Sequence, residues 1–244
     1  MDRELACTIS FGFILIFQSS VWGSTGETLQ SRLANLLSDD HDYRRDAETL
    51  FEECEVGSNR FVQTAKEVYA EHLSARERSR LVSLISKHAE IPDLPFLEGC
   101  VTNAMVGLPA LTGILRLQGV CSNSIAQIAR FNQAVDMQGE DRMLMTQTAF
   151  AVVSLFREPV WNMSSCEGKT LAWKFAYSYV SNNVNQAGLI DEAIQRIDPT
   201  YKNSKRRLAL LRLAQPVVPG PFSPEYVTNA INELVAYPEA ELPE

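Results

Sequence analysis

The chain has 244 residues, of which 45% are hydrophobic and 21% charged, and these proportions exclude a disordered or collagen-like protein. Its formal net charge of −8 argues against a broad nucleic-acid-binding surface, because phosphate contacts need a basic face. The length is sufficient for one large domain or two small ones with a buried core.

The first 23 residues have the features of a secretory signal peptide. Residues 9–17 form an apolar run that is too short for a bilayer, which needs about 20 residues. Small or permissive residues then precede a cleavage site before Ser24. Residues 2–4 are net acidic where a positive start is usual, and a buried N-terminal helix is the alternative. The pattern predicts that residues 1–23 are removed and that the protein is secreted, or periplasmic in a bacterium.

Four cysteines follow this leader, and an even number favours pairing in an oxidising compartment. They are Cys54, Cys100, Cys121 and Cys166. We predict two disulfides that join Cys54 to Cys100 and Cys121 to Cys166. The competing connectivity joins Cys100 to Cys121 and Cys54 to Cys166, and four reduced, buried thiols are a further alternative. The spacing of the cysteines and histidines matches no structural zinc site, so no metal or other cofactor is predicted.

The clearest secondary-structure signals are helical. Ser74 and Glu77 have the spacing of a capping box, and the helix that they begin should end before Pro92. Residues 142–156 and 171–180 are apolar on nearly all sides, which predicts two helices in the centre of the protein. Amphipathic helices over residues 61–73 and 205–214 should surround them.

The cysteines also outline an internal repeat. The blocks 54–100 and 121–166 both predict the order helix, polar break, helix, proline and cysteine, and a third copy without cysteines follows over residues 189–216. We therefore predict an all-α domain over residues 24–214, built as a bundle of helical hairpins stapled by two disulfides. Stacked hairpins would form a short irregular α-solenoid, whereas a chance resemblance between hairpins would leave an ordinary globular bundle.

The last part of the chain differs in composition. Residues 215–224 contain four prolines and predict a stiff, extended connection. Residues 225–244 predict a C-terminal helix through Val227, Ile231 and Val235, followed by an acidic tail.

Signatures of the common catalytic motifs are missing from the sequence. The densest polar cluster is Asp39, Asp40, His41 and Asp42. A hydrolase could use Asp40 and His41 as an acid–base pair, and the same residues could approach a metal. The alternative is a solvated acidic turn whose aspartates cap the next helix.

Two other features indicate a contact surface. A candidate contact face is formed by the basic residues Lys202, Lys205, Arg206, Arg207 and Arg212. It could contact acidic lipid, a glycosaminoglycan or an acidic partner, unless these residues are merely the solvated side of a helix. Asn162 begins the triplet Asn-Met-Ser and is a candidate glycosylation site.

Together these observations predict a secreted, non-enzymatic binding protein that uses a helical scaffold surface to bind a protein partner. The alternative is a carrier of an apolar small molecule within the helical core, whose cavity would be lined by Met143, Met145, Phe150, Phe156, Trp173 and Tyr177. We predict no nucleic-acid partner and no stable membrane insertion after the leader is removed.

Overall fold

The computed structural model describes residues 28–38, 43–53, 58–71, 73–137, 142–214, 224–238, 240–242 and 244. The predicted signal peptide, Cys54, the cluster Asp39 to Asp42 and residues 215–223 of the predicted connection lie outside these ranges. Every secondary-structure element of the described residues is helical, which confirms the all-α prediction.

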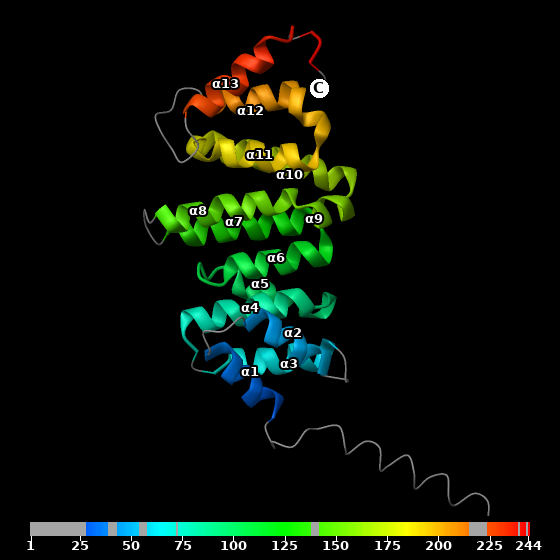
Figure 1. Cartoon of the computed structure of the whole chain (residues 1–244), viewed down its shortest axis with the longest axis vertical. Helices are drawn as coiled ribbons and strands as arrows, with labels where there is room; N and C mark the ends of the chain where they lie inside the picture. Colours follow the sequence, from blue (N-terminus) through cyan, green and yellow to red (C-terminus); the bar gives the residue numbers. More distant parts are fainter. Residues whose placement is uncertain are drawn as a thin grey trace, which may run out of the picture.

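The helices follow one another in a stack along a single long axis (Figure 1). In chain order they are α1 (Leu29–Ser38), α2 (Tyr43–Glu53), α3 (Ser58–Tyr69), α4 (Ala75–His88), α5 (Leu94–Cys100), α6 (Gly107–Gln118), α7 (Ser122–Asp136), α8 (Arg142–Val153), α9 (Glu158–Met163), α10 (Cys166–Asn182), α11 (Ala187–Ile197), α12 (Lys205–Ala214) and α13 (Pro224–Val235). Short 3₁₀ segments lie between them: η1 (Ile91–Asp93), η2 (Ser154–Phe156), η3 (Val184–Gln186) and η4 (Pro199–Asn203). Each helix contacts mainly helices that are near it in the chain.

The order of elements recurs along the stack. Helices α3 and α4 are followed by η1, the short helix α5 and the longer helix α6. Helices α7 and α8 are likewise followed by η2, the short helix α9 and the longer helix α10. Both short helices have a proline in their first two positions. This order agrees with the order of helices and prolines predicted for the two blocks.

Local signals fix the ends of α4. The Ser74 hydroxyl accepts a hydrogen bond from the Glu77 backbone N–H at 3.3 Å, and the Glu77 carboxylate accepts one from the Ser74 backbone N–H at 2.7 Å. This is the predicted capping box. The helix ends at His88, before Pro92, also as predicted. At this end Arg116 of α6 donates from Nε to the Ser86 carbonyl at 2.9 Å, so that α6 both packs against α4 and satisfies its last turn.

A buried ion pair joins α11 to α12. Arg207 is 5% exposed and Asp191 is fully buried. The Arg207 Nε lies 3.1 Å from Asp191 Oδ1, and Nη2 lies 3.2 Å from Oδ2. Nη1 also donates to the Lys202 carbonyl at 3.0 Å, while Gln195 donates to Asp191 Oδ2 at 2.7 Å. Both charges are therefore paired and hydrogen-bonded, as burial requires.

The predicted central position of residues 171–180 is only partly correct. Ala172, Ala176 and Val180 are fully buried on one side of α10. Tyr177 is 37% exposed and Trp173 is half-buried, because the opposite side of α10 borders a pocket and the solvent. Aromatic residues thus give α10 an apolar sequence without placing it at the centre of the stack.

The predicted disulfides are not formed, because Cys100, Cys121 and Cys166 are all free. Cys100 is buried at the end of α5, and this burial raises the pKa of its thiol. The segments before Cys121 and Cys166 do meet, since the Val120 N–H donates to the Ser164 hydroxyl at 2.9 Å. Cys121 nevertheless sits at the N-cap of α7, and Cys166 is exposed in the first turn of α10. Since each predicted pair contains at least one of these free thiols, helix packing and not sulfur bridges holds the described part of the chain together.

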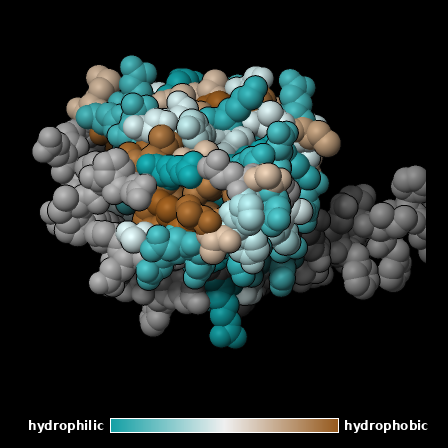
Figure 2. All heavy atoms as spheres, turned by 90° about the horizontal axis from the view of Figure 1, so that it is seen from above, coloured by the Kyte–Doolittle hydropathy of each residue, from teal (hydrophilic) through white to brown (hydrophobic). Residues whose placement is uncertain are grey.

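The end of the stack at which α13 lies has an apolar area on its surface. Among the described helices, none is long and apolar enough to cross a membrane. Figure 2 looks along the stack from the end at which α13 lies, and shows an apolar area among polar side chains. Val235 of α13 is 57% exposed. This end of the stack is therefore not covered entirely by polar side chains.

Candidate binding pocket

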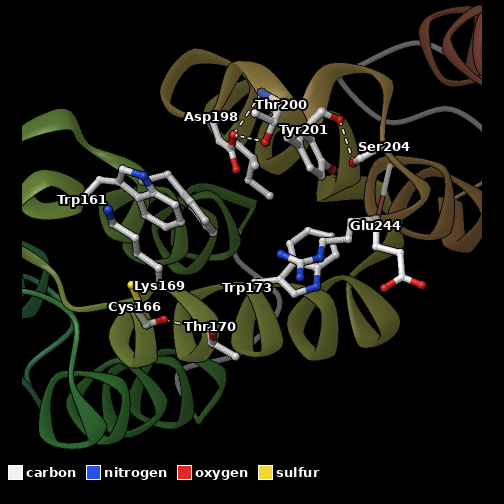
Figure 3. A pocket seen from close by; sticks show the side chains of 13 residues that line it. Trp161, Cys166, Lys169, Thr170, Trp173, Asp198, Thr200, Tyr201, Ser204 and Glu244 are labelled. Carbon is white, nitrogen blue, oxygen red and sulfur yellow. Dashed lines mark hydrogen bonds between the residues drawn. The ribbon is translucent and has the colours of Figure 1, made fainter. Parts of the chain in front are cut away.

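A pocket of about 240 Å³ lies between α9 and α10 on one side and η4 and α12 on the other (Figure 3). Its aromatic lining residues are Phe156, Trp161, Trp173 and Tyr201. Its polar and remaining lining residues are Cys166, Lys169, Thr170, Ile194, Asp198, Thr200, Ser204, Arg206 and Glu244. The pocket thus combines large flat apolar surfaces with both signs of charge.

One wall of the pocket is a stripe along α10. Cys166, Lys169, Thr170 and Trp173 have the spacing i, i+3, i+4 and i+7, which places them on one side of a helix. The Ser165 hydroxyl caps this helix by accepting from the Gly168 N–H at 3.1 Å. The cap and the helix together fix the positions of the four side chains.

The opposite wall is the turn between α11 and α12. The Asp198 carboxylate accepts hydrogen bonds from the Thr200 N–H at 3.0 Å and from the Thr200 hydroxyl at 2.6 Å. The Ser204 hydroxyl donates to the Tyr201 carbonyl at 2.8 Å. These bonds within the turn hold Tyr201 in place, so this wall is ordered by local polar contacts.

Aromatic contacts connect the two walls. The Trp173 ring meets the Tyr201 ring edge to face, with centroids 5.6 Å apart. The ring centroids of Trp161 and Phe156 are 5.6 Å apart. Lys169 Nζ lies 5.4 Å from the centroid of the Trp161 ring in a cation–π arrangement. Such an arrangement can hold an apolar or aromatic side chain and can offer an ammonium group to an acid beside it.

The charges at the rim are balanced. Lys169 and Arg206 supply two positive groups, and Asp198 and Glu244 supply two negative groups. The Asp198 carboxylate already accepts two hydrogen bonds from Thr200. Glu244 belongs to the segment that follows α13, far from Asp198 in the sequence. Within the described residues, no group of three or more His, Cys, Asp and Glu side chains could hold a metal ion.

The predicted basic face is exposed on η4 and α12 apart from one member. The exposed residues are Lys202, Lys205, Arg206 and Arg212. Arg207 does not belong to this face, because its guanidinium is turned inward to Asp191. Since neighbouring helical positions differ by about 100° in direction, a run of basic residues cannot all point to the solvent.

A second hollow, of about 460 Å³, lies along one side of α12. Lys205, Leu208, Ala209 and Arg212 line it with the spacing i, i+3, i+4 and i+7, and Ala240 lines its other side. The basic face therefore lies beside the segment that follows α13.

The other candidate residues are separate from the pocket or outside the described ranges. Asn162 is exposed on α9 beside Trp161, and its glycosylation stays a prediction. Asp40 and His41 lie outside the described residues.

Sequence reasoning named only part of this pocket. Six residues were expected to line a cavity, and two of them, Phe156 and Trp173, line the pocket. Phe150 and Tyr177 are exposed outside it, and the side chains of Met143 and Met145 are not among those that the structure describes. Trp161, Tyr201 and Asp198 were not expected to do so. The spacing of Cys166, Lys169, Thr170 and Trp173 marks one face of a helix, but no local signal shows that the turn over residues 198–204 lies opposite.

Comparison with known proteins gives no relative. No protein-family model matches the chain, and no match to a curated protein or to a solved structure is found. The function must therefore be inferred from the geometry of the chain itself.

Proposed function

We propose that this protein is a binding scaffold whose pocket between α10 and α12 receives a side chain of a partner protein. The observation that carries the proposal is the pair of pocket walls bearing Trp161, Trp173 and Tyr201. Tryptophan, tyrosine and arginine are the residues that most often dominate protein–protein binding energy. Helical layers that contact mainly their neighbours are typical of short α-solenoids, which present rigid surfaces to partners.

The volume of the pocket favours a single anchoring group. Sites for whole small molecules usually occupy roughly 300–1,000 Å³. The pocket measures about 240 Å³ and has charged groups at its rim. It is thus suited to one side chain with an apolar body and a polar end. The carrier hypothesis needs a larger and more apolar space than this pocket supplies.

The test compares two aromatic residues, one that lines the pocket and one outside it. Short random peptides are selected for binding to the whole protein, and their affinities are measured by isothermal titration calorimetry. Trp173→Ala removes a pocket wall and should weaken the selected peptides by about 2 kcal/mol, roughly 30-fold in Kd. Phe150→Ala removes an exposed aromatic side chain of α8 outside the pocket and should leave the affinities unchanged. Circular dichroism checks that both variants are folded.

Peptides that bind Trp173→Ala as tightly as the unmodified protein would place the binding surface elsewhere and contradict the proposal. Retained bound lipid-like masses in native mass spectrometry would instead favour a carrier.

We propose further that the protein acts after export. The support for export is the apolar run over residues 9–17. Cysteine pairing no longer supports it, because Cys100, Cys121 and Cys166 are free. Expression of the whole chain in secreting cells should yield protein in the medium whose first residue is Ser24, as read by N-terminal sequencing. Protein that stays inside the cells with its leader intact would contradict export.

A further inference from the structure

Residues 238–244 are here named the acidic segment, and the structure describes 238, 240–242 and 244 among them. These described residues return from the end of α13 toward α12 (Figure 1). The Glu241 N–H donates to the Pro238 carbonyl at 2.8 Å, which turns the chain. Leu242 is only 3% exposed and belongs to the hydrophobic core. Glu244 lines the aromatic pocket (Figure 3), and Ala240 lines the second hollow. The segment therefore touches both concave features of this end of the protein.

The segment and the helix beneath it have opposite charges. Its sequence, PEAELPE, contains three glutamates and no basic residue. Lys205 and Arg212 share the second hollow with Ala240, and Arg206 shares the pocket with Glu244. Exposed opposite charges at such positions contribute modestly to affinity but favour one kind of partner and speed its association.

A buried leucine adds apolar contact to the charge attraction between the acidic segment and α12. Leu242 is flanked in sequence by Glu241 and Glu244 with one proline between, and burial of its side chain supplies apolar contact. An acidic stretch around one leucine is thus complementary to a surface that combines cations with an apolar depression.

We propose that the exposed face of α12 and the adjoining pocket form a docking site for an acidic, leucine-containing segment of a partner protein, and that residues 238–244 occupy this site in cis as a competitor. The inference rests on the proposed function, because the partner enters the same pocket. It adds the chemistry of the partner and a reason for the site to be guarded.

The loss of peptide affinity caused by the tethered acidic segment can be estimated. A tethered segment has an effective concentration on the order of 1 mM. If a free peptide of the same sequence binds the vacated site with a Kd of about 0.1 mM, the tethered copy weakens its apparent affinity about tenfold. This ratio can be measured.

The experiment releases the acidic segment in the whole chain. The triple substitution Glu241→Lys, Leu242→Ser and Glu244→Lys removes the anchor and makes the segment repel α12. A fluorescein-labelled peptide with the sequence of residues 238–244 is then titrated and followed by anisotropy. It should bind the released variant about tenfold more tightly than the unmodified protein. Added salt should weaken this binding, because the attraction is partly ionic.

Two controls isolate the site. Glu233→Lys changes the charge of α13 at an exposed position and should not increase peptide binding. Arg206→Glu in the released variant should weaken peptide binding severalfold, because it replaces one attraction with a repulsion. A peptide in which glutamine replaces every glutamate should bind less well than the acidic one.

A protease experiment covers the case in which the triple variant does not fold. In the otherwise unmodified chain, Arg206→Glu should loosen the segment and speed cleavage after Glu241 by a glutamate-specific protease. An unchanged cleavage rate would contradict the inference.

The outcomes separate the two proposals. Equal binding of the labelled peptide to the released and unmodified proteins, or no binding to the released variant, overturns the docking of acidic segments. If selected random peptides still depend on Trp173, the proposed function survives that result. If they do not, both proposals fall.

Discussion

Arg207→Ala should lower the free energy of unfolding by about 3–5 kcal/mol. The substitution removes the partner of Asp191, which is completely buried between α11 and α12. A buried carboxylate without its cation keeps the cost of leaving water and loses the compensating attraction. The change is measured by urea unfolding, followed by far-UV circular dichroism and analysed by linear extrapolation.

A neighbouring arginine provides the matched control. Arg206→Ala removes the same side chain one position earlier, where it is exposed, and should change stability by less than about 0.5 kcal/mol. The double substitution Asp191→Leu with Arg207→Met should recover most of the loss, because an apolar pair of similar volume avoids the desolvation cost. Equal effects of Arg206→Ala and Arg207→Ala would show that the ion pair contributes nothing particular.

The same ion pair shows where sequence reasoning stops. The helix over residues 205–214 is predictable from its apolar spacing, and its bounds agree with α12. Whether Arg207 faces solvent depends on Asp191, which lies 16 residues earlier in another helix. The capping box of α4 is predictable because both of its residues are within one turn. Contacts inside one helix can be inferred from spacing, whereas contacts between helices cannot.

The disulfide prediction is wrong for a related reason. Counting them assumes that chain segments brought together will also bring their sulfur atoms together. Val120 and Ser164 do hold the segments of Cys121 and Cys166 side by side, but the two thiols remain free. A disulfide needs a narrow range of Cα separation and of side-chain direction, and the number of cysteines contains no information about either.

Only one of the two walls of the pocket could be predicted from the sequence. The stripe from Cys166 to Trp173 can be recognised from its helical spacing, which places these side chains on one face of α10. The facing turn, with Asp198 and Tyr201, follows a different helix, and only the packing of α10 on α12 opposes the two. The pocket is therefore formed by the packing of helices that are distant in the sequence, and no local sequence motif predicts it.

Gly168→Ala should destabilise the protein by about 3 kcal/mol, although alanine is the better helix former by about 1 kcal/mol. A Cβ atom at Gly168 would lie 2.2 Å from the Val120 carbonyl oxygen, far inside van der Waals contact. The obstacle is backbone and cannot rotate away, so the first turn of α10 must move from the start of α7. The urea midpoint measures this loss.

Gly99→Ala in α5 is the matched substitution, because a Cβ there meets nothing within 4 Å. It should stabilise the protein by about 0.4–1 kcal/mol, since alanine reduces the freedom of the unfolded chain. The two glycine substitutions thus have opposite expected signs, and a loss at both sites would contradict the close approach of α10 to α7. Because Cys166, Lys169 and Thr170 lie in the turn that must move, Gly168→Ala should also weaken peptides selected for the pocket, whereas Gly99→Ala should not. Closeness of the backbones at Gly168 then sets the position of one pocket wall as well as the stability of the stack.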